Sequence, residues 1–161
     1  LMAIQLESNL VWRALEKELF AVLGMVTAKG EARTVGIVYV THEKKVYIAS
    51  GKTTWKMRHV TANPNVSLTV TIPKSIPLMP FIKIPAATIT FAGKARILDT
   101  KDVSTEVTKS LLRGLDMESE EVKNMAVMET APQGDFVTYG VGVSMMTMRH
   151  PEEARGRAPV A

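Results

Sequence analysis

Residues 46–68 read VYIASGKTTWKMRHVTANPNVSL, and this stretch decides the fold. It opens with β-branched and aromatic residues and closes with another β-type run, which predicts two strands. Between them lies a short basic segment in which Thr53 or Thr54 can cap a helix and Asn63-Pro64 can end it. The stretch therefore predicts two strands joined through a short helix.

The start of this helix has the features of a phosphate site. Lys56 and Arg58 lie in its first turns. A helix N-terminus leaves backbone N–H groups without partners and carries partial positive charge, so a phosphate placed there meets donors that already point at it. We therefore expect residues 50–66 to bind a phosphate group.

The composition indicates a single domain that spans residues 1–161. Hydrophobic residues make up 46% of the chain, which excludes wholesale disorder. No apolar run approaches the roughly 20 residues that cross a bilayer, and the N-terminus lacks the pattern of a signal peptide. The chain has no cysteine, as is common in reducing compartments. We expect a cytoplasmic protein without a membrane partner.

The net charge of +4 raises the question of nucleic-acid binding. The basic residues form short groups rather than one long run, whereas duplex binding usually needs about 6–10 phosphate contacts. The chain also has only two Trp, three Tyr and four Phe, mostly within expected apolar runs. A small basic barrel that stacks bases is therefore a third and disfavoured alternative.

The first part of the chain predicts a helix followed by strands. The apolar spacing in residues 5–20 is that of an amphipathic helix, so we assign residues 1–19 to an N-terminal helical segment. Residues 20–98 form the expected barrel core, because β-type runs recur there between turn signals. The expected strands are 20–28, 33–41, 46–50, 66–72 and 87–98.

Residues 73–85 form an unusually apolar loop, with four prolines and six large apolar residues. The prolines exclude an ordinary central strand, so something other than ladder partners must cover these side chains. A subunit interface, a ligand ring or the core of the domain itself could do so.

Residues 99–131 form an expected helical segment. Apolar residues recur at helical spacing over 103–115 and again over 118–129, which predicts two helices. We interpret both helices as scaffold.

Residues 132–161 contain the expected final strand and a tail. A Pro-Gln-Gly turn at 132–134 precedes a strand over 135–148. The residues from 149 onward are polar, so the tail is either a solvated terminus or an arm whose arginines approach an anionic cofactor or substrate.

The sequence contains no recognisable catalytic constellation. Its three histidines, His42, His59 and His150, lack the short spacing of a metal site. The nucleophile elbow Gly-x-Ser-x-Gly and a Walker loop are also absent. We therefore assign no catalytic residue and no metal, and we expect a bound cofactor to supply any chemistry.

Three runs in the decisive stretch carry a resemblance to a known family. They are Val46-Tyr47-Ile48-Ala49-Ser50-Gly51, then Thr53-Thr54-Trp55-Lys56, then Asn63-Pro64-Asn65-Val66-Ser67-Leu68. In order and spacing they resemble the core of the FMN-binding split-barrel proteins related to pyridoxamine 5′-phosphate oxidase. The resemblance covers about residues 20–98, and its most specific elements are the Asn-Pro-x-Val end and the lysine eight residues before that proline.

This resemblance implies a mainly β fold with flanking helices, namely a six-stranded antiparallel split β-barrel. It also implies a homodimer with FMN in clefts between the subunits. Lys56 matches the lysine that contacts the FMN phosphate and Thr54 the neighbouring hydroxyl, while Trp55 stands where the related oxidases carry a second phosphate-binding arginine. The cofactor-binding residues implied in this way are Thr34, Val35, Gly36, Ile37, Ala49, Ser50, Thr54, Trp55, Lys56 and Thr88.

The chain departs from the true oxidases at the positions that hold their substrate. Tyr39 replaces the lysine for the substrate phosphate, and Arg149-His150-Pro151 lacks their Arg-x-His motif. We therefore expect no oxidation of pyridoxamine phosphate. We expect instead an FMN-dependent oxidoreductase that acts on an unidentified small molecule. The alternative is a non-catalytic module that binds or stores flavin, a deazaflavin coenzyme or haem, since members of the family hold each of these in the same cleft.

Overall fold

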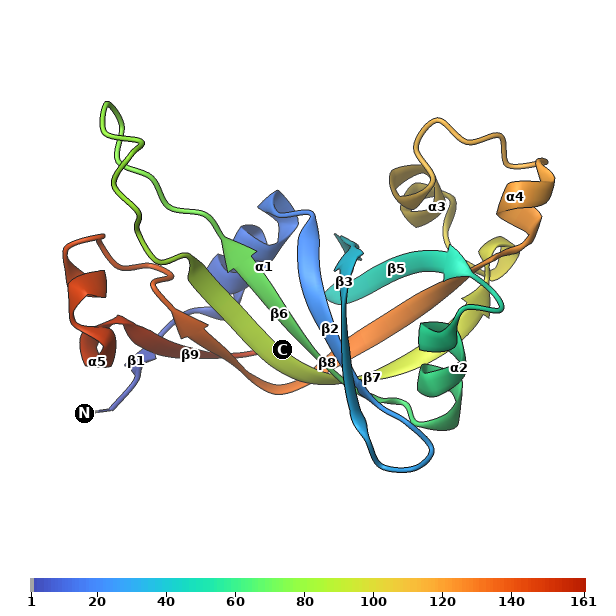
Figure 1. The fold of residues 1–161 in the computed structure, drawn as a ribbon, viewed down its shortest axis with the longest axis horizontal. Coiled ribbons are helices and arrows are strands. Elements are labelled where there is room, and N and C mark those ends of the chain that lie inside the picture. The colour runs from blue at the N-terminus through green and yellow to red at the C-terminus, as the bar shows by residue number, and fades with distance from the viewer. Residues whose placement is uncertain (1) are drawn as a thin grey trace.

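The computed structural model describes residues 2–161 and places nine strands in one sheet, with helices around it (Figure 1). The strands are β1 Ile4–Gln5, β2 Phe20–Val26, β3 Ala32–Val38, β4 Val40–His42, β5 Lys45–Gly51, β6 Asn65–Ile72, β7 Ala87–Asp99, β8 Met125–Tyr139 and β9 Arg155–Pro159. The helices are α1 Ser8–Lys17, α2 Trp55–Ala62, α3 Thr105–Leu111, α4 Glu120–Lys123 and α5 Pro151–Ala154, with 3₁₀ turns at Thr100–Asp102 and Thr147–Arg149.

Strand β8 is the centre of the sheet. It pairs antiparallel with β7 over most of its length, with β5 through its first half and with β9 through its second half. From β7 the sheet continues through β6 and β2 to β3, while β4 pairs with β5 and β1 pairs with β9 in parallel. Within residues 2–161, β3 has a ladder partner on one side only, so it is an edge strand.

The core lies between the sheet and α1. Val11, Trp12 and Leu15 are buried on the inner face of this helix. The Trp12 ring meets the Phe136 ring edge-on at a centroid distance of 5.3 Å, and its indole N–H donates to the carbonyl of Val160 at 3.0 Å. Burial of each such side chain contributes about 1.5–3 kcal/mol, so α1 closes one end of the strands through apolar contacts. Every helix within residues 2–161 is too short or too polar to cross a bilayer.

Most elements up to residue 111 confirm the prediction. β2, β5, β6 and β7 lie within two residues of their expected bounds, and α1 lies inside the segment 1–19. The helix expected between the third and fourth strands is α2, and α3 lies inside 103–115. The strand expected at 33–41 is instead split at Tyr39 into β3 and β4, because the Tyr39 hydroxyl turns inward and donates to the buried carbonyl of Leu15 at 2.7 Å.

The helix expected at 118–129 is wrong beyond residue 123. Helix α4 ends at Lys123, and β8 begins at Met125. The five residues from 126 to 130 are all buried, so both faces of the strand are covered there. A strand buried on both faces shows no apolar alternation, and its apolar residues can match a helical period by chance.

The end of the chain also differs from the prediction. The expected turn at 132–134 lies inside β8, which bends there at Gly134 with a φ of +75°. The final strand ends at Tyr139 rather than at residue 148, because Gly140 and Gly142 have φ values of +73° and +70° and turn the chain. The tail forms β9, in which small buried Gly156 and Ala158 alternate with exposed residues.

The strand count differs from the expected six-stranded antiparallel barrel. The structure is mainly β with a few helices, as expected, but its sheet has nine strands and is mixed because β1 and β9 are parallel. The short strands β1 and β9 come from the two chain ends, where the sequence predicted a helix and a polar tail.

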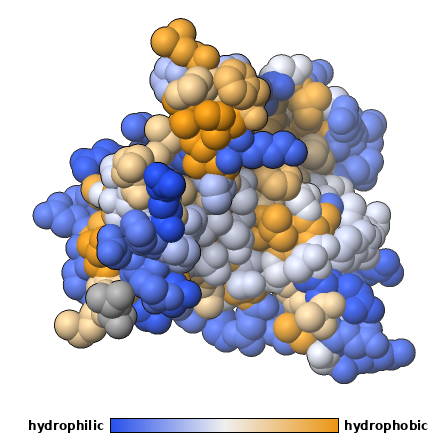
Figure 2. Space-filling view, turned by 60° about the vertical axis from the view of Figure 1, so that its left-hand side comes forward, coloured by the Kyte–Doolittle hydropathy of each residue, from blue (hydrophilic) through white to orange (hydrophobic). Residues whose placement is uncertain are grey.

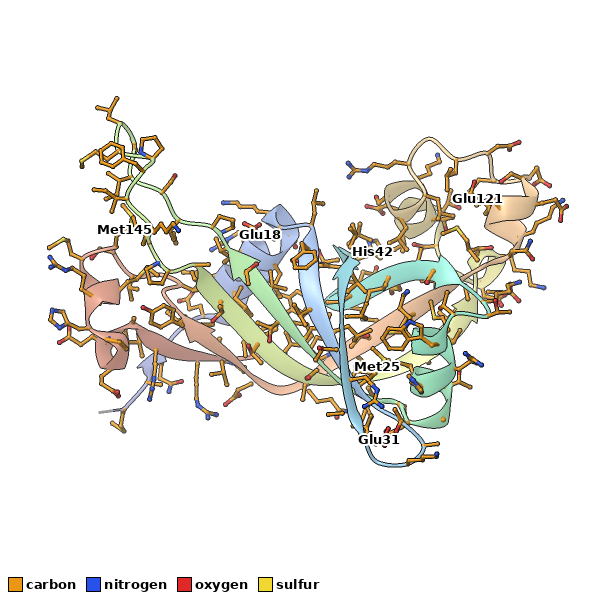
Figure 3. All side chains as sticks on the ribbon, in the orientation of Figure 1. Glu18, Met25, Glu31, His42, Glu121 and Met145 are labelled. Carbon is orange, nitrogen blue, oxygen red and sulfur yellow. The ribbon has the colours of Figure 1, made fainter. Side chains whose placement is uncertain are left out.

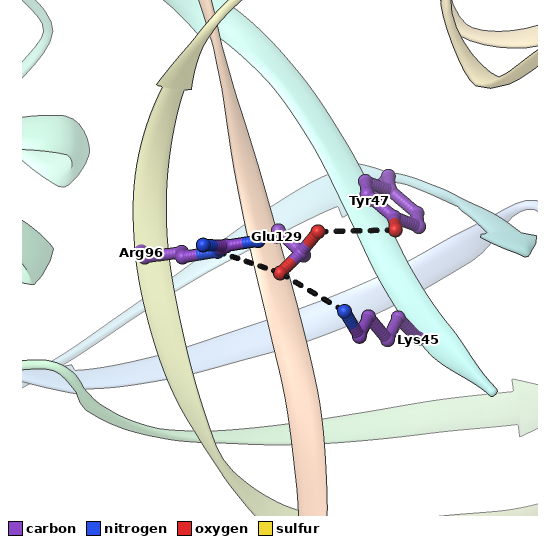
Figure 4. A network of polar contacts seen from close by, with 4 residues as sticks. All are labelled: Lys45, Tyr47, Arg96 and Glu129. Atoms are coloured by element: carbon purple, nitrogen blue, oxygen red, sulfur yellow. Dashed lines mark hydrogen bonds and ion pairs between the residues drawn. The ribbon is translucent and has the colours of Figure 1, made fainter. Parts of the chain in front are cut away.

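A buried carboxylate links three strands in the middle of the sheet (Figure 4). Glu129 on β8 lies directly opposite Tyr47 on β5 and Arg96 on β7. It accepts hydrogen bonds from Arg96 Nε at 2.7 Å, from the Tyr47 hydroxyl at 3.1 Å and from Lys45 Nζ at 3.4 Å. Burial alone would raise the pKa of Glu129, but the hydrogen bonds from Arg96 and Tyr47 and the charges of Lys45 and Arg96 outweigh it and lower that pKa. Burial and the adjacent Glu129 raise the pKa of Tyr47 to about 12.

We expect Glu129→Gln to lower the free energy of unfolding by about 1–2 kcal/mol, because the hydrogen bonds from Arg96 and Tyr47 lose their charged acceptor. The Arg96 side chain is 64% exposed, so water screens its share of the interaction and keeps the loss modest. Urea denaturation followed by circular dichroism measures the difference. Glu31→Gln is the matched control, since its ion pair with Arg33 is exposed on both sides, and it should change stability by less than about 0.5 kcal/mol.

The difference in the free energy of unfolding between the wild type and Glu129→Gln should depend on pH. Because the folded-state pKa of Glu129 lies below its ordinary value of 4.5, the stabilisation is complete above pH 4.5 and is lost as the pH falls through the lowered pKa. Denaturation curves of the wild type and of Glu129→Gln should therefore converge in acid. A difference that stays constant as the pH falls would show that the carboxylate charge is not the source of the stabilisation.

Candidate functional site

The site begins where β5 leads into α2. Thr54 holds the position before the helix, as expected, but its hydroxyl does not cap the helix. It donates instead to the carbonyl of Gly51 at 2.9 Å and lies 3.3 Å from the Ser50 hydroxyl. These contacts fix the bend between strand and helix and leave the first turn of α2 without a side-chain cap.

The first turn of α2 therefore presents free backbone donors. The N–H of Arg58 bonds to the carbonyl of Thr54 at 3.1 Å, whereas those of Trp55, Lys56 and Met57 have no backbone acceptor within residues 2–161. Unsatisfied N–H groups and the partial positive charge of the helix end favour an anion at this point.

Of the cations near this turn, Lys56 and Arg58 form no ion pair with any carboxylate of residues 2–161. Lys52 is already occupied, since its Nζ lies 3.0 Å from Asp99 Oδ1. The hydrogen bond from Lys52 and its charge hold the pKa of Asp99 below its usual range. Lys56, half-buried in the first turn, is therefore the cation placed to meet an anion at the free N–H groups.

Trp55 covers one side of this turn. Its ring is 40% exposed and meets His59, one turn along α2, edge-on at a centroid distance of 5.7 Å. The side chain thus offers an apolar surface next to Lys56 rather than the second cation that an arginine would supply.

The residues predicted on the second strand lie on β3, the edge strand. Ile37 points into the core, and Val35 is half-buried against it. Thr34 and Gly36 are exposed. A Cβ at Gly36 would lie 2.8 Å from the ring of Phe20, so glycine leaves room for that ring at this position. Backbone groups on the outer edge of β3 have no strand partner within residues 2–161.

The residues predicted on the third strand, Ala49 and Ser50, lie on β5. This strand contacts β3. Ser50 is buried and contacts Thr54, as described above. Ala49 is half-buried and lines a hollow of about 290 Å³ between β5 and α3. The structure thus brings together Ala49, Ser50 and the start of α2, with the edge of β3 beside them.

Thr88 does not join this group within one chain. It lies at the start of β7, opposite Thr71 and Tyr139, whereas α2 lies at the other end of that strand, where Asp99 binds Lys52. At about 3.3 Å per residue the strand from Thr88 to Asp99 spans roughly 36 Å if it is straight. Because β7 has a register shift between Thr90 and Ala92, this length is an upper limit. Thr88 and the residues that lead into α2 lie at opposite ends of the strand.

Sequence reasoning missed the residues of the helical segment that face Ala49. The hollow beside Ala49 is also lined by Val38, Leu111 and Met125, with Ser110 and Arg113 at its polar side. The apolar spacing of this segment was interpreted as scaffold only. The signal that could have found it is Arg113, a cation that follows a run of leucines at the end of a short helix.

The apolar loop 73–85 projects from the body between β6 and β7, and its side chains form the hydrophobic area at the top of Figure 2. Leu78 is 97% and Phe81 79% exposed. The alternative that this loop packs over the core of its own domain is therefore wrong. An interface or a ligand stays as the expected cover.

The site holds few groups that could act as acids, bases or ligands of a metal. Within residues 2–161 no three His, Cys, Asp or Glu side chains cluster as metal ligands would. The first turn of α2 has no acidic residue, and Asp99 at the end of β7 is already paired with Lys52. The arrangement can therefore bind an anion through Lys56 and the free N–H groups, and a flat apolar group against the Trp55 ring.

Comparison with solved structures shows the same fold in proteins of distant sequence. A Listeria innocua protein proposed to be a pyridoxamine 5′-phosphate oxidase has a TM-score of 0.61 and 16% identity, covering 78% of this chain and 92% of the other. An F420 reductase has a TM-score of 0.57 and 17% identity, covering 81% and 94%. A haem-binding protein from Mycobacterium smegmatis has a TM-score of 0.63 and 13% identity, covering 96% of this chain and 57% of the other.

Comparison of the sequence with protein families gives a more direct result. No curated protein matches the sequence significantly. A family model described as pyridoxamine 5′-phosphate oxidase matches residues 11–134, which include most of α1, all strands from β2 to β7 and most of β8. The chain therefore belongs to the pyridoxamine 5′-phosphate oxidase family.

Proposed function

We propose that this protein binds FMN and acts as an FMN-dependent oxidoreductase on a small molecule. The observation that carries the proposal is the unpaired Lys56 at the start of α2, next to backbone N–H groups without acceptors. The shared family and the match of this segment to the phosphate-binding segment of the family support the same assignment.

The phosphate of FMN fits the first turn of α2. Lys56 supplies the positive charge, the free N–H groups supply donors, and Thr54 adds a hydroxyl that lies at the bend. Charge-assisted hydrogen bonds of this type are about twice as strong as neutral ones, so they would dominate the affinity. Trp55 cannot replace a second cation, which makes Lys56 the main electrostatic contact.

The ring of FMN fits the edge of β3. The isoalloxazine carries carbonyl and N–H groups along one side, and an edge strand offers the matching backbone groups. Gly36 leaves room for the Phe20 ring against β3, while Ala49 and the hollow beside it offer apolar contact. FMN, when bound, would supply the redox chemistry through its ring, which the protein side chains lack.

We further propose that two copies complete the site. Strands β2, β3, β5, β6, β7 and β8 then form the six-stranded split barrel of the family, with FMN between two such barrels. Thr88 and the Asp99 that pairs with Lys52 lie at opposite ends of β7, so we expect the second copy to contribute Thr88. Leu19, Phe20 and Val38 form an apolar patch beside the β3 edge, with exposures of 58%, 49% and 63%, and this patch needs a cover.

In such a dimer the loop 73–85 would gain a function. The loop projects from the body of its own subunit and its apolar side chains are exposed. In the dimer these side chains would cover a substrate bound in the site of the neighbouring subunit. The closed site would exclude water, which favours transfer of hydride over side reactions.

A second candidate function is a binding module that stores or delivers a planar cofactor without turnover. The pairing of Asp99 with Lys52 favours it, because the carboxylate next to this segment is already held in an ion pair. An F420 reductase and a haem-binding protein share the fold, so a deazaflavin coenzyme or haem is an alternative occupant of the same cleft.

We expect Lys56→Ala to weaken FMN binding by roughly 10- to 100-fold, because a charge-assisted contact to the phosphate contributes about 1.5–3 kcal/mol. The fold should stay intact, since Lys56 forms no ion pair with a carboxylate of residues 2–161. Quenching of flavin fluorescence on titration measures the affinity.

Two comparisons make this result specific to the phosphate. Arg58→Ala on the same helix should weaken FMN binding less than Lys56→Ala does, because Arg58 lies beyond the three free N–H groups. Riboflavin, which has no phosphate, should bind the wild type and Lys56→Ala equally. Equal FMN affinity of Lys56→Ala and the wild type would place the phosphate elsewhere.

We expect Val38→Asp to disrupt the dimer and FMN binding together, because a charge in the apolar patch must be desolvated on association. Sedimentation velocity measures the oligomeric state, and circular dichroism checks the fold. Ala28→Asp, an equally polar change at an exposed turn between β2 and β3, should alter neither property. A monomeric wild type that binds FMN fully would refute the role of the second copy.

The two candidate functions predict different behaviour of the FMN-loaded protein. An oxidoreductase should lose flavin absorbance when NADH or NADPH is added without oxygen, and regain it when an electron acceptor follows. Anaerobic stopped-flow absorbance measures both steps. Retention of oxidised flavin under a broad set of donors, with FMN still bound, would favour the binding module instead.

A further inference from the structure

A second cavity lies beside α1, and none of the residues assigned to FMN lines it. It has a volume of about 330 Å³, within the range of small-molecule sites. Three segments that are distant in sequence surround it: the second half of α1, the root of the loop 73–85 and the turn after β8 at 141–142.

The floor of this cavity is apolar. Leu10 and Ala14 line it from α1, Ile72 from the end of β6, Ala87 from the start of β7 and Val141 from the turn after β8. Ala87 is fully buried and Val141 is 6% exposed, so the floor belongs to the packed core and cannot collapse into the space above it. An apolar group that entered here would replace water over an apolar surface, which is favourable by about 25 cal/mol for each Å² buried.

The rim of the same cavity is basic. Arg13 and Lys17 lie four residues apart on α1 and so share one face of the helix, and Lys74 lies opposite them at the root of the loop. None of these three side chains forms an ion pair with a carboxylate of residues 2–161. Glu18 is the single carboxylate in the lining, at the end of α1 near the root of the loop in Figure 3.

Three cations around one hollow repel each other, and a single carboxylate does not balance them. A concave site with low-dielectric walls concentrates their field, so an anion that enters meets a stronger attraction than at a flat surface. The apolar floor and the basic rim therefore select the same kind of molecule, one with an anionic head and an apolar body.

The cavity is separate from the proposed flavin site. None of the residues assigned to FMN lines it. Ala87 and Thr88 are neighbours on β7, but successive side chains of a strand point to opposite faces, so the buried Ala87 and the half-buried Thr88 serve different surfaces.

We propose that this cavity binds a small anionic amphiphile, a molecule with one carboxylate or phosphate head and an unbranched apolar tail. The head contacts Arg13, Lys17 and Lys74, and the tail covers Leu10, Ala14, Ile72 and Val141. The bound molecule connects α1 with the root of the loop 73–85. The proposal does not depend on the flavin assignment, because it uses other residues.

Decanoate is the probe, and isothermal titration calorimetry with the wild-type protein measures its binding. We expect saturable binding of one molecule per chain. Decanol, which keeps the tail, and acetate, which keeps the head, should each bind at least tenfold more weakly. Equal binding of decanoate and decanol would overturn the role of the basic rim.

Variants test the residues. Lys74→Ala should weaken decanoate binding roughly tenfold through loss of one charge-assisted contact, and Glu18→Gln should strengthen it about two- to threefold through loss of a repulsive charge. Ala14→Leu fills the cavity while preserving helix propensity, so it should abolish binding with an unchanged circular dichroism spectrum.

Lys29→Ala is the matched control, an exposed lysine at the turn between β2 and β3 that does not line the cavity, and it should bind decanoate as the wild type does. FMN affinity should be the same in all four variants, which separates this site from the flavin site. Unchanged decanoate binding by both Lys74→Ala and Ala14→Leu would overturn the proposal.

Discussion

A buried carboxylate in the central strand constrains the rest of the structure. Glu129 loses most of its hydration, and such a charge is tolerated in a protein interior only when it is paired. Its partners Tyr47 and Arg96 lie directly opposite it on the strands at either side. Neither β5 nor β7 can shift along β8 without leaving this charge unpaired. Because β5 runs directly into α2, the register fixed by Glu129 also determines where Lys56 lies.

The candidate site consists of groups that the fold leaves without partners. The sheet ends at β3, so one edge of backbone donors and acceptors stays open, and the bend at Thr54 leaves the first N–H groups of α2 free. These groups can hold a molecule that brings phosphate and a polar ring edge. They cannot transfer protons or electrons themselves. Both proposed functions, oxidoreductase and binding module, are therefore compatible with this site. Which of them applies depends on whether an electron donor and a substrate reach the bound cofactor.

The sequence predicted most elements up to residue 111, because each of them shows its own periodicity or boundary residues. Residues 46–68 show both strand periodicity and helix boundaries, and the structure places β5, α2 and β6 there. The start of β8 could not be predicted, because residues 126–130 are buried on both faces and lose their alternation. The pairing of the tail as β9 depends on contacts far along the chain. In the site, the sequence order alone predicted that Ser50, Thr54 and Lys56 lie close together. The position of Thr88 at the other end of β7 depends on the pairing of the strands, which the sequence does not show.

The visible absorption spectrum tests the central claim, that this chain holds a flavin by its phosphate at α2, most directly. The purified protein would be measured before and after addition of excess FMN and removal of unbound FMN by desalting. The account predicts the two bands of oxidised flavin in the protein fraction, at up to one FMN for each chain. A Soret band in the purified protein would instead identify haem as the occupant. A protein that stays colourless after incubation with FMN would contradict the claim.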